Sequence, residues 1–413
     1  MRETLTILVI GTADTKADEL LFLRDCLIGA GASASLMDVG VLGEAPFRPE
    51  HDHHAVAAAA GMTINQIAAL ADENEAMSAM ARGASLLAAQ LHANGQIDGM
   101  IALGGTMGTD LALDVALALP TGVPKVVLST IAFSSLIPPQ RIAPDLTMML
   151  WAGGLYGLND ICRGSLAQAA GAVLGAARGR FTGGARKPVI GMSSLGKSCL
   201  SYMVTLQPAL QARGFELAVF HTTGMGGRAF ETLAAQGHFA AVMDFSLQEL
   251  TNQLNGSVVS AGEDRLLGAA RGLVPQIVAP GATDMIDLPA WQPLPARYKD
   301  RGFHAHNRLI ASVAASADER RATARAIGER LAQSTASVAF LLPMLGIEQW
   351  DRPGEPMHDP QGLQAFIDEA RLAIRPPVEL VEVEAHINDE LFAQAALSVL
   401  DHWIQAGKVS RDA

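Results

Sequence analysis

Apolar runs of strand length alternate with helical patterns from the start of this chain, and that alternation constrains the fold most. LTILVIG (5–11) predicts a buried strand, and ADELLFLRDCLIGAG (17–31) repeats apolar residues at helical spacing before stopping at Gly31. Further strands are predicted over 34–40, 97–105 and 125–130, and helices over 77–95 and 109–120, with a long, polar, His-rich connection after residue 40. Such a rhythm predicts an α/β fold with a parallel sheet covered on both faces.

The rhythm starts again in the second half of the chain. Small, flexible and basic residues replace it around residues 178–187, which predicts a linker. Strands are then predicted at 187–194, 215–224, 239–246, 275–282, 338–346 and 378–388, and helices at 200–214, 228–237 and 389–405. We therefore expect two open α/β domains, residues 1–182 and 183–413, with ligands beyond the carboxyl ends of the strands.

Composition and charge exclude several classes of protein. The 413 residues exceed one ordinary core, and the net charge of −12, without a cluster of basic and aromatic residues, argues against nucleic acid as a partner. Three cysteines are too few for a disulfide framework, which favours a reducing compartment. The sequence has no signal-peptide pattern and no apolar run of membrane-spanning length, so we expect a soluble cytoplasmic protein with no membrane partner.

Two glycine- and threonine-containing loops follow predicted strands of the first domain. GTADTK (11–16) and GGTMGTD (104–110) each precede a predicted helix, where free N–H groups and the helix dipole favour an anion. Lys16 adds positive charge, and Asp14 suits a magnesium ion or a sugar hydroxyl; the alternative is that Asp14 or Thr15 caps the helix. Asp38 suits ribose hydroxyls or a turn. The predicted nucleotide-binding residues are Gly11, Thr12, Ala13, Asp14, Thr15, Lys16, Asp38, Gly104, Gly105, Thr106, Gly108 and Thr109.

Glycine loops also end strands in the second domain, and they suit a small anionic ligand such as a carboxylate or phosphate. GMSSLGKSCL (191–200) satisfies the P-loop pattern GxxxxGK(S/T), and Asp244 ends a strand as a Walker B acid would. HTTGMGGRAFE (221–231), PGATDM (280–285) and FHAHN (303–307) supply hydroxyl, charged and imidazole groups. His221 and His306 are the candidate bases. The predicted ligand residues are Ser193, Ser194, Lys197, Ser198, Thr222, Thr223, Gly224, Gly226, Gly227, Arg228, Asp284, His306 and Asn307.

The segment HDHH (51–54) raises the question of a zinc site. Its spacing is too tight for two imidazoles to chelate one ion comfortably, and no cysteine lies nearby. We therefore predict an exposed loop and no metal site. GxSxG and HExxH motifs are absent, which removes the main support for a serine hydrolase or a zincin.

A series of motifs resembles one known family. GTADTK, DVGVLG (38–43), AAAAG (57–61), GGTMGT, FHTTGMGGRAFE, SAGEDRL (260–266), PGATDMID (280–287) and the pair His306–Asn307 occur in order through most of the chain. Together they resemble the Tm-one-like ATP-binding family, which includes the N-terminal region of the tomato mosaic virus resistance protein and uncharacterised bacterial proteins. The resemblance implies two Rossmann-like open parallel-sheet domains, ATP in the first, and homodimers or higher homo-oligomers, but no established reaction. Lys197 departs from the family, whose corresponding loop usually lacks the lysine.

These observations predict an ATP-binding protein whose first-domain loops hold the phosphates. If it is an enzyme, phosphoryl transfer or ATP-driven carboxylate activation of a small anionic metabolite fits best, with a magnesium ion held partly by Asp14. One alternative is a regulatory module that senses ATP without turnover. Another is a P-loop NTPase that uses residues 191–198.

Overall fold

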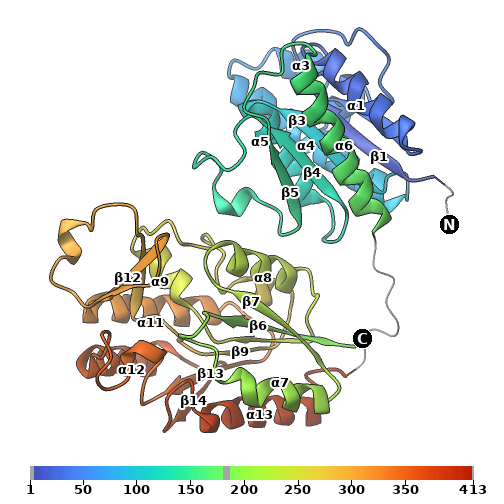
Figure 1. The fold of residues 1–413 in the computed structure, drawn as a ribbon. Helices are drawn as coiled ribbons and strands as arrows, with labels where there is room; N and C mark the ends of the chain where they lie inside the picture. The colour runs from blue at the N-terminus through green and yellow to red at the C-terminus, as the bar shows by residue number, and fades with distance from the viewer. Residues whose placement is uncertain (1–3, 180–186, 412–413) are drawn as a thin grey trace. The chain divides into compact units, whose positions relative to one another are not determined.

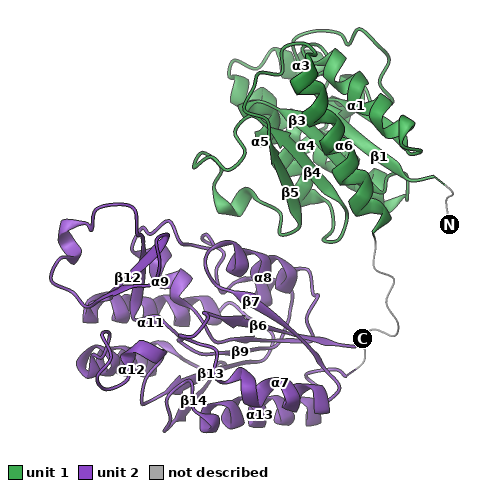
Figure 2. Ribbon diagram, in the orientation of Figure 1, with its two compact units in different colours: residues 1–182 green, residues 183–413 purple. Residues whose placement is uncertain are grey.

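The computed structural model describes residues 4–179 and 187–411, and the chain divides into two compact units, residues 1–182 and 183–413 (Figure 2). Most of the predicted linker and the predicted domain boundary fall within residues 180–186, outside the described residues. The last helix before them ends at Arg178, and the first strand after them begins at Val189.

Unit 1 is built on a five-stranded sheet of order β2-β1-β3-β4-β5 in which every pair is parallel (Figure 1). Its strands are β1 Thr6–Gly11, β2 Ser33–Asp38, β3 Gly99–Gly104, β4 Lys125–Ser129 and β5 Leu146–Leu150. Its helices are α1 Ala17–Gly29, α2 His53–Ala59, α3 Ile64–Ala68, α4 Glu73–Ala93, α5 Thr106–Ala118 and α6 Asp160–Arg178, with a short 3-10 helix at Pro139–Arg141.

Alternate residues of β1 enter two separate cores, as expected for a sheet covered on both faces. Ile7 and Val9 pack with residues of α1 and α6, whereas Leu8 and Ile10 pack with residues of α2, α4 and α5. The predicted parallel sheet is therefore confirmed. The polar connection after residue 40 is more structured than predicted, because it contains α2 and α3, whose buried residues join the second of these cores.

Unit 2 holds a six-stranded parallel sheet of order β14-β13-β9-β8-β6-β7. Its strands are β6 Val189–Ser194, β7 Glu216–His221, β8 Ala241–Asp244, β9 Gln276–Val278, β13 Val338–Pro343 and β14 Glu379–Val383. Its helices are α7 Met203–Ala212, α8 Met225–Ala235, α9 Gln248–Leu254, α10 Gly268–Arg271, α11 Ala317–Leu331, α12 Pro360–Ala373 and α13 Glu390–Gln405, with 3-10 turns at Ala296–Tyr298 and Gln349–Asp351.

A small antiparallel sheet of order β10-β12-β11 was not predicted. It consists of β10 Met285–Pro289, β11 Phe303–Ala305 and β12 Ile310–Ala314. No α-helix separates these strands, so the alternation of strand and helix that predicted the others did not indicate them. The fold class is nonetheless the predicted one, with two Rossmann-like α/β domains on open parallel sheets.

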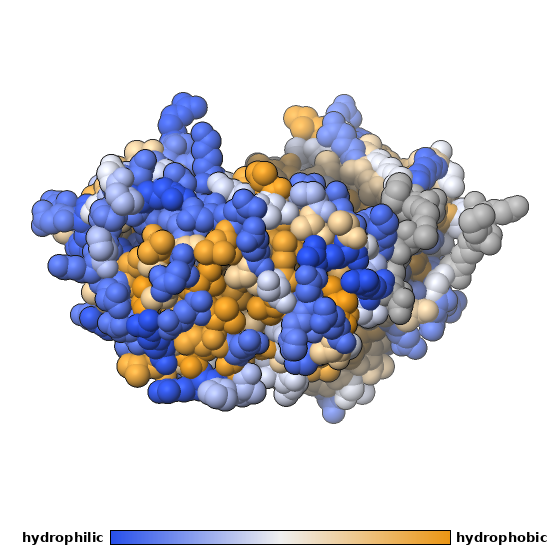
Figure 3. Space-filling view, turned by 90° about the horizontal axis from the view of Figure 1, so that it is seen from below, coloured by the Kyte–Doolittle hydropathy of each residue, from blue (hydrophilic) through white to orange (hydrophobic). Residues whose placement is uncertain are grey.

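The structure shows the apolarity of the helices and of part of the surface. Among the helices of the described ranges, none combines the length and apolarity that crossing a bilayer requires. Seen from below, the molecule presents a broad area of hydrophobic residues (Figure 3). Unit 2 carries exposed apolar side chains on α7, where Val204 is 81% exposed, and on α13, where Leu391 is 52% exposed.

Candidate functional site

The strand order of unit 1 places a topological switch between β1 and β3. Strand β2 lies on one side of β1, while β3, β4 and β5 lie on the other. In sheets of this order the connections leave toward opposite faces at the switch, which opens a crevice at the carboxyl ends of the two strands. The loop GTADTK follows β1 and the loop GGTMGT follows β3, so both predicted phosphate loops end at this crevice.

A cavity of about 560 Å³ lies between these loops. Two predicted sets of residues from distant parts of the chain line it together. From the loop after β1 these are Thr12, Asp14, Thr15 and Lys16, and from the loop after β3 they are Gly104, Gly105, Thr106 and Gly108.

Apolar residues form another part of the cavity lining. Val39, Val41 and Leu42 come from the segment after β2, and Ile67 and Leu70 come from α3 and the turn after it. We call the residues from the two loops the polar end of the cavity and the apolar residues its apolar end; the charged residues of the lining are Asp14, Lys16 and Glu73. These apolar lining residues were not predicted, because residues 41–72 read as a polar connection.

Helix α5 directs its N-terminus at the polar end. Its N-cap, Gly105, makes no side-chain capping bond, and its first turn contains no acidic residue. A Cβ atom at Gly104 would lie 2.6 Å from the Cα of Gly108, so glycine is needed for this tight turn. The uncapped N-terminus of a 13-residue helix favours an anion in the cavity.

The loop after β1 adds hydroxyl groups and a cation. The hydroxyls of Thr12 and Thr15 lie 2.7 Å apart, and the Lys16 N–H donates to the carbonyl of Thr12. Within the described part of the chain, the Lys16 ammonium forms no ion pair, although Asp14 lies two residues away. Instead, the Asp14 carboxylate accepts from the N–H of Leu42 at 3.1 Å, and its Oδ1 has no hydrogen-bond partner among the described residues.

Asp38 has a different place from the other predicted residues. Its carboxylate is buried and accepts hydrogen bonds from the N–H groups of Ala13 and Gly40, each at 2.9 Å. Burial raises the pKa of this carboxyl, and the two backbone hydrogen bonds oppose that shift. Asp38 does not line the cavity, and it joins the loops after β1 and β2.

Three more of the predicted nucleotide-binding residues lie outside the lining of this cavity: Gly11, Ala13 and Thr109. Thr109 is buried, and its hydroxyl lies 2.7 Å from that of Ser129.

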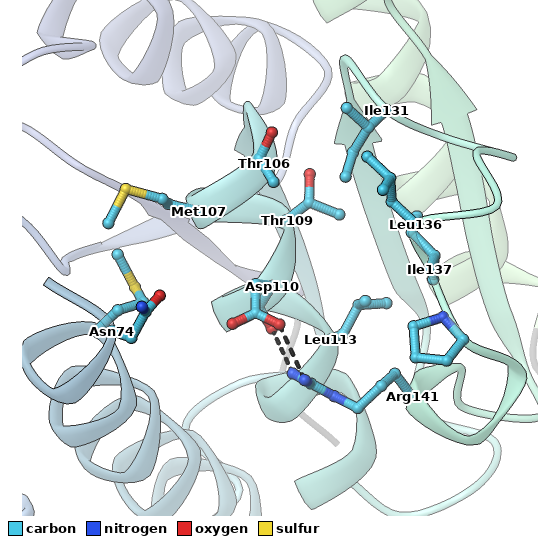
Figure 4. Close-up of a pocket in the computed structure, with 12 residues that line it drawn as sticks. Asn74, Thr106, Met107, Thr109, Asp110, Leu113, Ile131, Leu136, Ile137 and Arg141 are labelled. Atoms are coloured by element: carbon cyan, nitrogen blue, oxygen red, sulfur yellow. Dashed lines mark hydrogen bonds and ion pairs between the residues drawn. The ribbon is translucent and has the colours of Figure 1, made fainter.

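A second hollow of about 200 Å³ adjoins the cavity at the first turn of α5, and its lining is drawn in Figure 4. The two hollows share Met77, Thr106 and Met107. Arg141 pairs with Asp110 at 2.9 Å across the lower part of this hollow in Figure 4. Sequence reasoning missed Arg141, which stands alone in a proline-containing stretch after β4.

The switch of unit 2 lies between β6 and β8, and a buried network of charges occupies it. The Ser193 hydroxyl donates to Asp244 at 2.6 Å. The fully buried guanidinium of Arg265 contacts Asp244 at 2.5 Å, Glu231 at 2.7 Å and Glu249 at 2.9 Å. Burial raises the pKa of Glu249 to about 7. Asp244, a candidate Walker B acid, is thus engaged by Arg265 and Ser193.

The segment GMSSLGKSCL does not have the geometry of a P-loop. A P-loop helix begins with the GK(S/T) residues, whereas residues 196–198 form a turn here and α7 begins at Met203. Lys197 is exposed, and the buried Ser198 hydroxyl donates to Glu348 at 3.3 Å.

The two candidate bases of unit 2 line one small hollow of about 50 Å³. His221, Thr223 and His306 are brought together there with Asp287 and Trp350. This juxtaposition joins the end of β7 and the loop after it to the antiparallel sheet.

The remaining predicted residues of unit 2 have structural partners. Thr222 donates to the carbonyl of Ser194, Arg228 pairs with Asp264 at 3.1 Å, and Asn307 accepts from backbone N–H groups within its own turn. A Cβ atom at Gly227 would overlap the carboxylate of Glu249, and one at Gly226 would overlap the carbonyl of His221; Gly224 adopts a φ of +97°. Close packing therefore requires these glycines.

Two buried carboxyl groups lie beyond the ends of β9 and β13. Asp284 and Glu348 are fully buried, and among the described residues both oxygens of Asp284 and Oε1 of Glu348 have no hydrogen-bond partner. Burial raises the pKa of each carboxyl. The charge of Asp284 raises the pKa of Glu348 further, whereas Arg320 opposes the shift of Asp284. Asp284 is among the residues predicted from the sequence, whereas Glu348 is not, because it belongs to no recognisable motif.

Relatives of the chain are found in bacteria and in a plant. A UPF0261 protein of Brucella suis biovar 1 is 55% identical over 403 residues, which cover 98% of this chain and 96% of that protein. A UPF0261 protein of Clostridium tetani is 32% identical and covers 94% of this chain and 96% of its own length. The tomato protein described as ToMV susceptible protein tm-1(GCR26) is 27% identical. The match covers 94% of this chain and 54% of the tomato protein.

Solved structures match only remotely. UDP-GlcNAc 2-epimerase from Methanocaldococcus jannaschii is 9% identical, with a TM-score of 0.22 over 67% of this chain and 83% of that chain. The glycosyltransferase SsfS6 of Streptomyces is 14% identical, with a TM-score of 0.18 over 67% of this chain and 82% of that chain.

The family models match nearly the whole sequence. The N-terminal domain of the uncharacterised protein family UPF0261 matches residues 5–182, and the C-terminal domain matches residues 187–404. Both domains occur in the order that the two units have here. The chain therefore belongs to the uncharacterised protein family UPF0261.

Proposed function

We propose that the cavity of unit 1 binds ATP. One observation carries the proposal: the loops after β1 and β3 line a single cavity at the switch point, and its lining combines Lys16 and threonine hydroxyls with apolar side chains. A nucleotide has the matching halves, a charged triphosphate and a flat base. The resemblance to the Tm-one-like ATP-binding family selects ATP among the nucleotides.

In this proposal the phosphates lie at the polar end. Lys16 neutralises their charge, the hydroxyls of Thr12, Thr15 and Thr106 donate to their oxygens, and the uncapped turn of α5 supplies N–H groups. The base lies against Val41, Leu42 and the other apolar residues. Asp14 is the candidate residue for a magnesium ion, because it lines the same end and its Oδ1 is unpartnered among the described residues.

Titration calorimetry of ATP with MgCl₂ tests the proposal. Replacing Lys16 with alanine should weaken ATP binding at least about tenfold, since a charge-assisted contact to phosphate is lost. Lys197→Ala is the matched control, because it removes a lysine from the P-loop-like segment. An unchanged affinity in Lys16→Ala together with a loss in Lys197→Ala would reverse the assignment and favour a P-loop site.

After binding ATP, the protein could act as an enzyme that turns ATP over or as a sensor that does not. These two alternatives predict different experimental results. An enzyme acting on a small carboxylate or phosphate would use the hollow that contains His221 and His306. A sensor would bind ATP without turnover. Phosphate release measured with a panel of small carboxylates, in the protein and in His221→Ala and His306→Ala, separates the two.

The homo-oligomer implied by the resemblance also stays a proposal. Analytical ultracentrifugation at several concentrations, with and without ATP, measures it directly. A monomer under all conditions would contradict it.

A further inference from the structure

Two adjacent histidines are held in place at the start of α2, in the segment HDHH. His51 pairs with Met37 at the end of β2 through an isolated parallel bridge, which fixes the chain beside the sheet. Asp52 then caps α2 by accepting from the N–H of Ala55 at 2.8 Å. His53 and His54 are thereby the first two residues of the helix.

A carboxylate from the preceding loop meets both imidazoles. Glu44, His53 and His54 each offer one ligand atom, and these atoms all lie within 4.8 Å of one another. Oε1 of Glu44 is 3.5 Å from Nε2 of His53 and 3.8 Å from Nε2 of His54. Ligand atoms about 2.0–2.2 Å from one tetrahedral zinc ion lie about 3.3–3.6 Å apart, so small rotations of the side chains reach that spacing.

His53 supplies an independent sign of a missing ligand. The residue is only 4% exposed, yet among the described residues neither of its ring nitrogens has a hydrogen-bond partner. Buried polar side chains are nearly always satisfied by a partner. The Nε2 side of this ring points into the cluster, toward Glu44.

The other side of the ring faces a buried carboxylate. Oδ2 of Asp38 is 3.7 Å from Nδ1 of His53, while Oδ1 of Asp38 accepts from the N–H groups of Ala13 and Gly40. Carboxylate, imidazole and metal in a row is the usual arrangement around a metal-binding histidine, because the carboxylate orients the ring and selects its tautomer. Asp38 is therefore a positioning residue here.

We propose that Glu44, His53 and His54 bind one divalent transition-metal ion such as Zn²⁺, with Asp38 orienting His53. Imidazole ligands select this class of ion over Mg²⁺ and Ca²⁺, which prefer oxygen. Glu44 and His54 are 82% and 57% exposed in their side chains, so the ion reaches the cluster from solvent and keeps water as a further ligand. The tight spacing of HDHH does not prevent this site, since His51 takes no part and the third ligand comes from another segment.

Competition titration of the full chain with Zn²⁺ against a chromogenic chelator, after stripping and without nucleotide, tests the proposal. One ion per chain is expected, with Co²⁺ giving the visible absorption of a tetrahedral site. The exposed substitutions Glu44→Gln and His54→Ala should each weaken binding at least about tenfold without affecting folding, and Asp38→Asn should do so by a similar factor.

His51→Ala is the matched control, because this histidine lies beside the cluster but outside it. Its Zn²⁺ affinity should equal that of the unmodified protein. The proposal is overturned if the unmodified protein binds no more tightly than Glu44→Gln or His54→Ala, or if His51→Ala loses as much affinity as they do. Since no nucleotide is present, failure here leaves ATP binding untouched, and Lys16→Ala should still bind Zn²⁺ normally.

Discussion

The carboxylate of Asp38 accepts a hydrogen bond from the N–H of Ala13 at 2.9 Å, so the end of β2 holds the loop that follows β1. The same oxygen accepts from Gly40, and both bonds are buried. Asp38 thus positions the cavity of unit 1 from behind, and its second oxygen faces His53. One side chain therefore connects the proposed ATP site to the proposed metal site.

Replacing Asp38 should separate these two roles. Asp38→Ala leaves two buried N–H groups unpaired and should lower the free energy of unfolding by about 1–3 kcal/mol, with weaker ATP binding. Asp38→Asn keeps an oxygen that accepts both bonds, so its stability and ATP affinity should stay close to those of the unmodified protein. Urea unfolding and calorimetry measure both. Equal losses of stability and ATP affinity in the two variants would contradict the proposed role of the two backbone hydrogen bonds to Asp38.

Gly104→Ala should distort the turn between β3 and α5. The added Cβ would lie 2.6 Å from the Cα of Gly108, so the loop must move and the N-terminus of α5 with it. We expect reduced thermal stability and loss of ATP binding. Gly164→Ala in α6 is the control, because a Cβ there meets no atom within 4 Å and alanine favours the helix. It should leave ATP binding unchanged and stability equal or slightly higher.

Arg265→Met should be the most destabilising single change in unit 2. It leaves Asp244, Glu231 and Glu249 buried without their shared cation, and breaking a buried ion pair in this way costs about 3–5 kcal/mol. Denaturant unfolding of the full chain measures the loss. Arg321→Met, which removes an exposed pair with Asp318 within α11, should change stability by less than about 1 kcal/mol. A similar loss of stability in the two variants would contradict the stabilising role of the buried charge network.

The buried acid Glu348 should make stability depend on pH. Its pKa is raised in the folded state, so the native protein keeps a proton that the unfolded chain releases above the ordinary value of about 4.5. Its contribution to stability is therefore complete in acid and declines as pH rises above that value. Glu348→Gln mimics the protonated form and should be more stable than the unmodified protein at pH 8, with a flatter profile. Glu355→Gln, at an exposed position, should retain the original slope.

Local patterns were sufficient to predict much of unit 1. The β1 run TILVIG, the helix after it and the glycine turn before α5 were recognisable because each depends on a few adjacent residues, and both loops were expected to bind one ligand. The sequence also suggested the second-domain loops around His221 and His306. It did not reveal the antiparallel sheet, whose short strands derive their stability from pairing with one another.

What the sequence by itself determined is the kind of each element: apolar periodicity selects strand or helix, and glycine, threonine and lysine at strand ends select loops suited to an anion. Tertiary structure alone decided which groups meet. The order β2-β1-β3 brings Lys16 and Thr106 to one cavity, buries Asp38 outside its lining and sets Glu44 near His53 and His54. These contacts join segments distant in the chain, and their geometry depends on long-range strand pairing and helix packing, which no local pattern encodes.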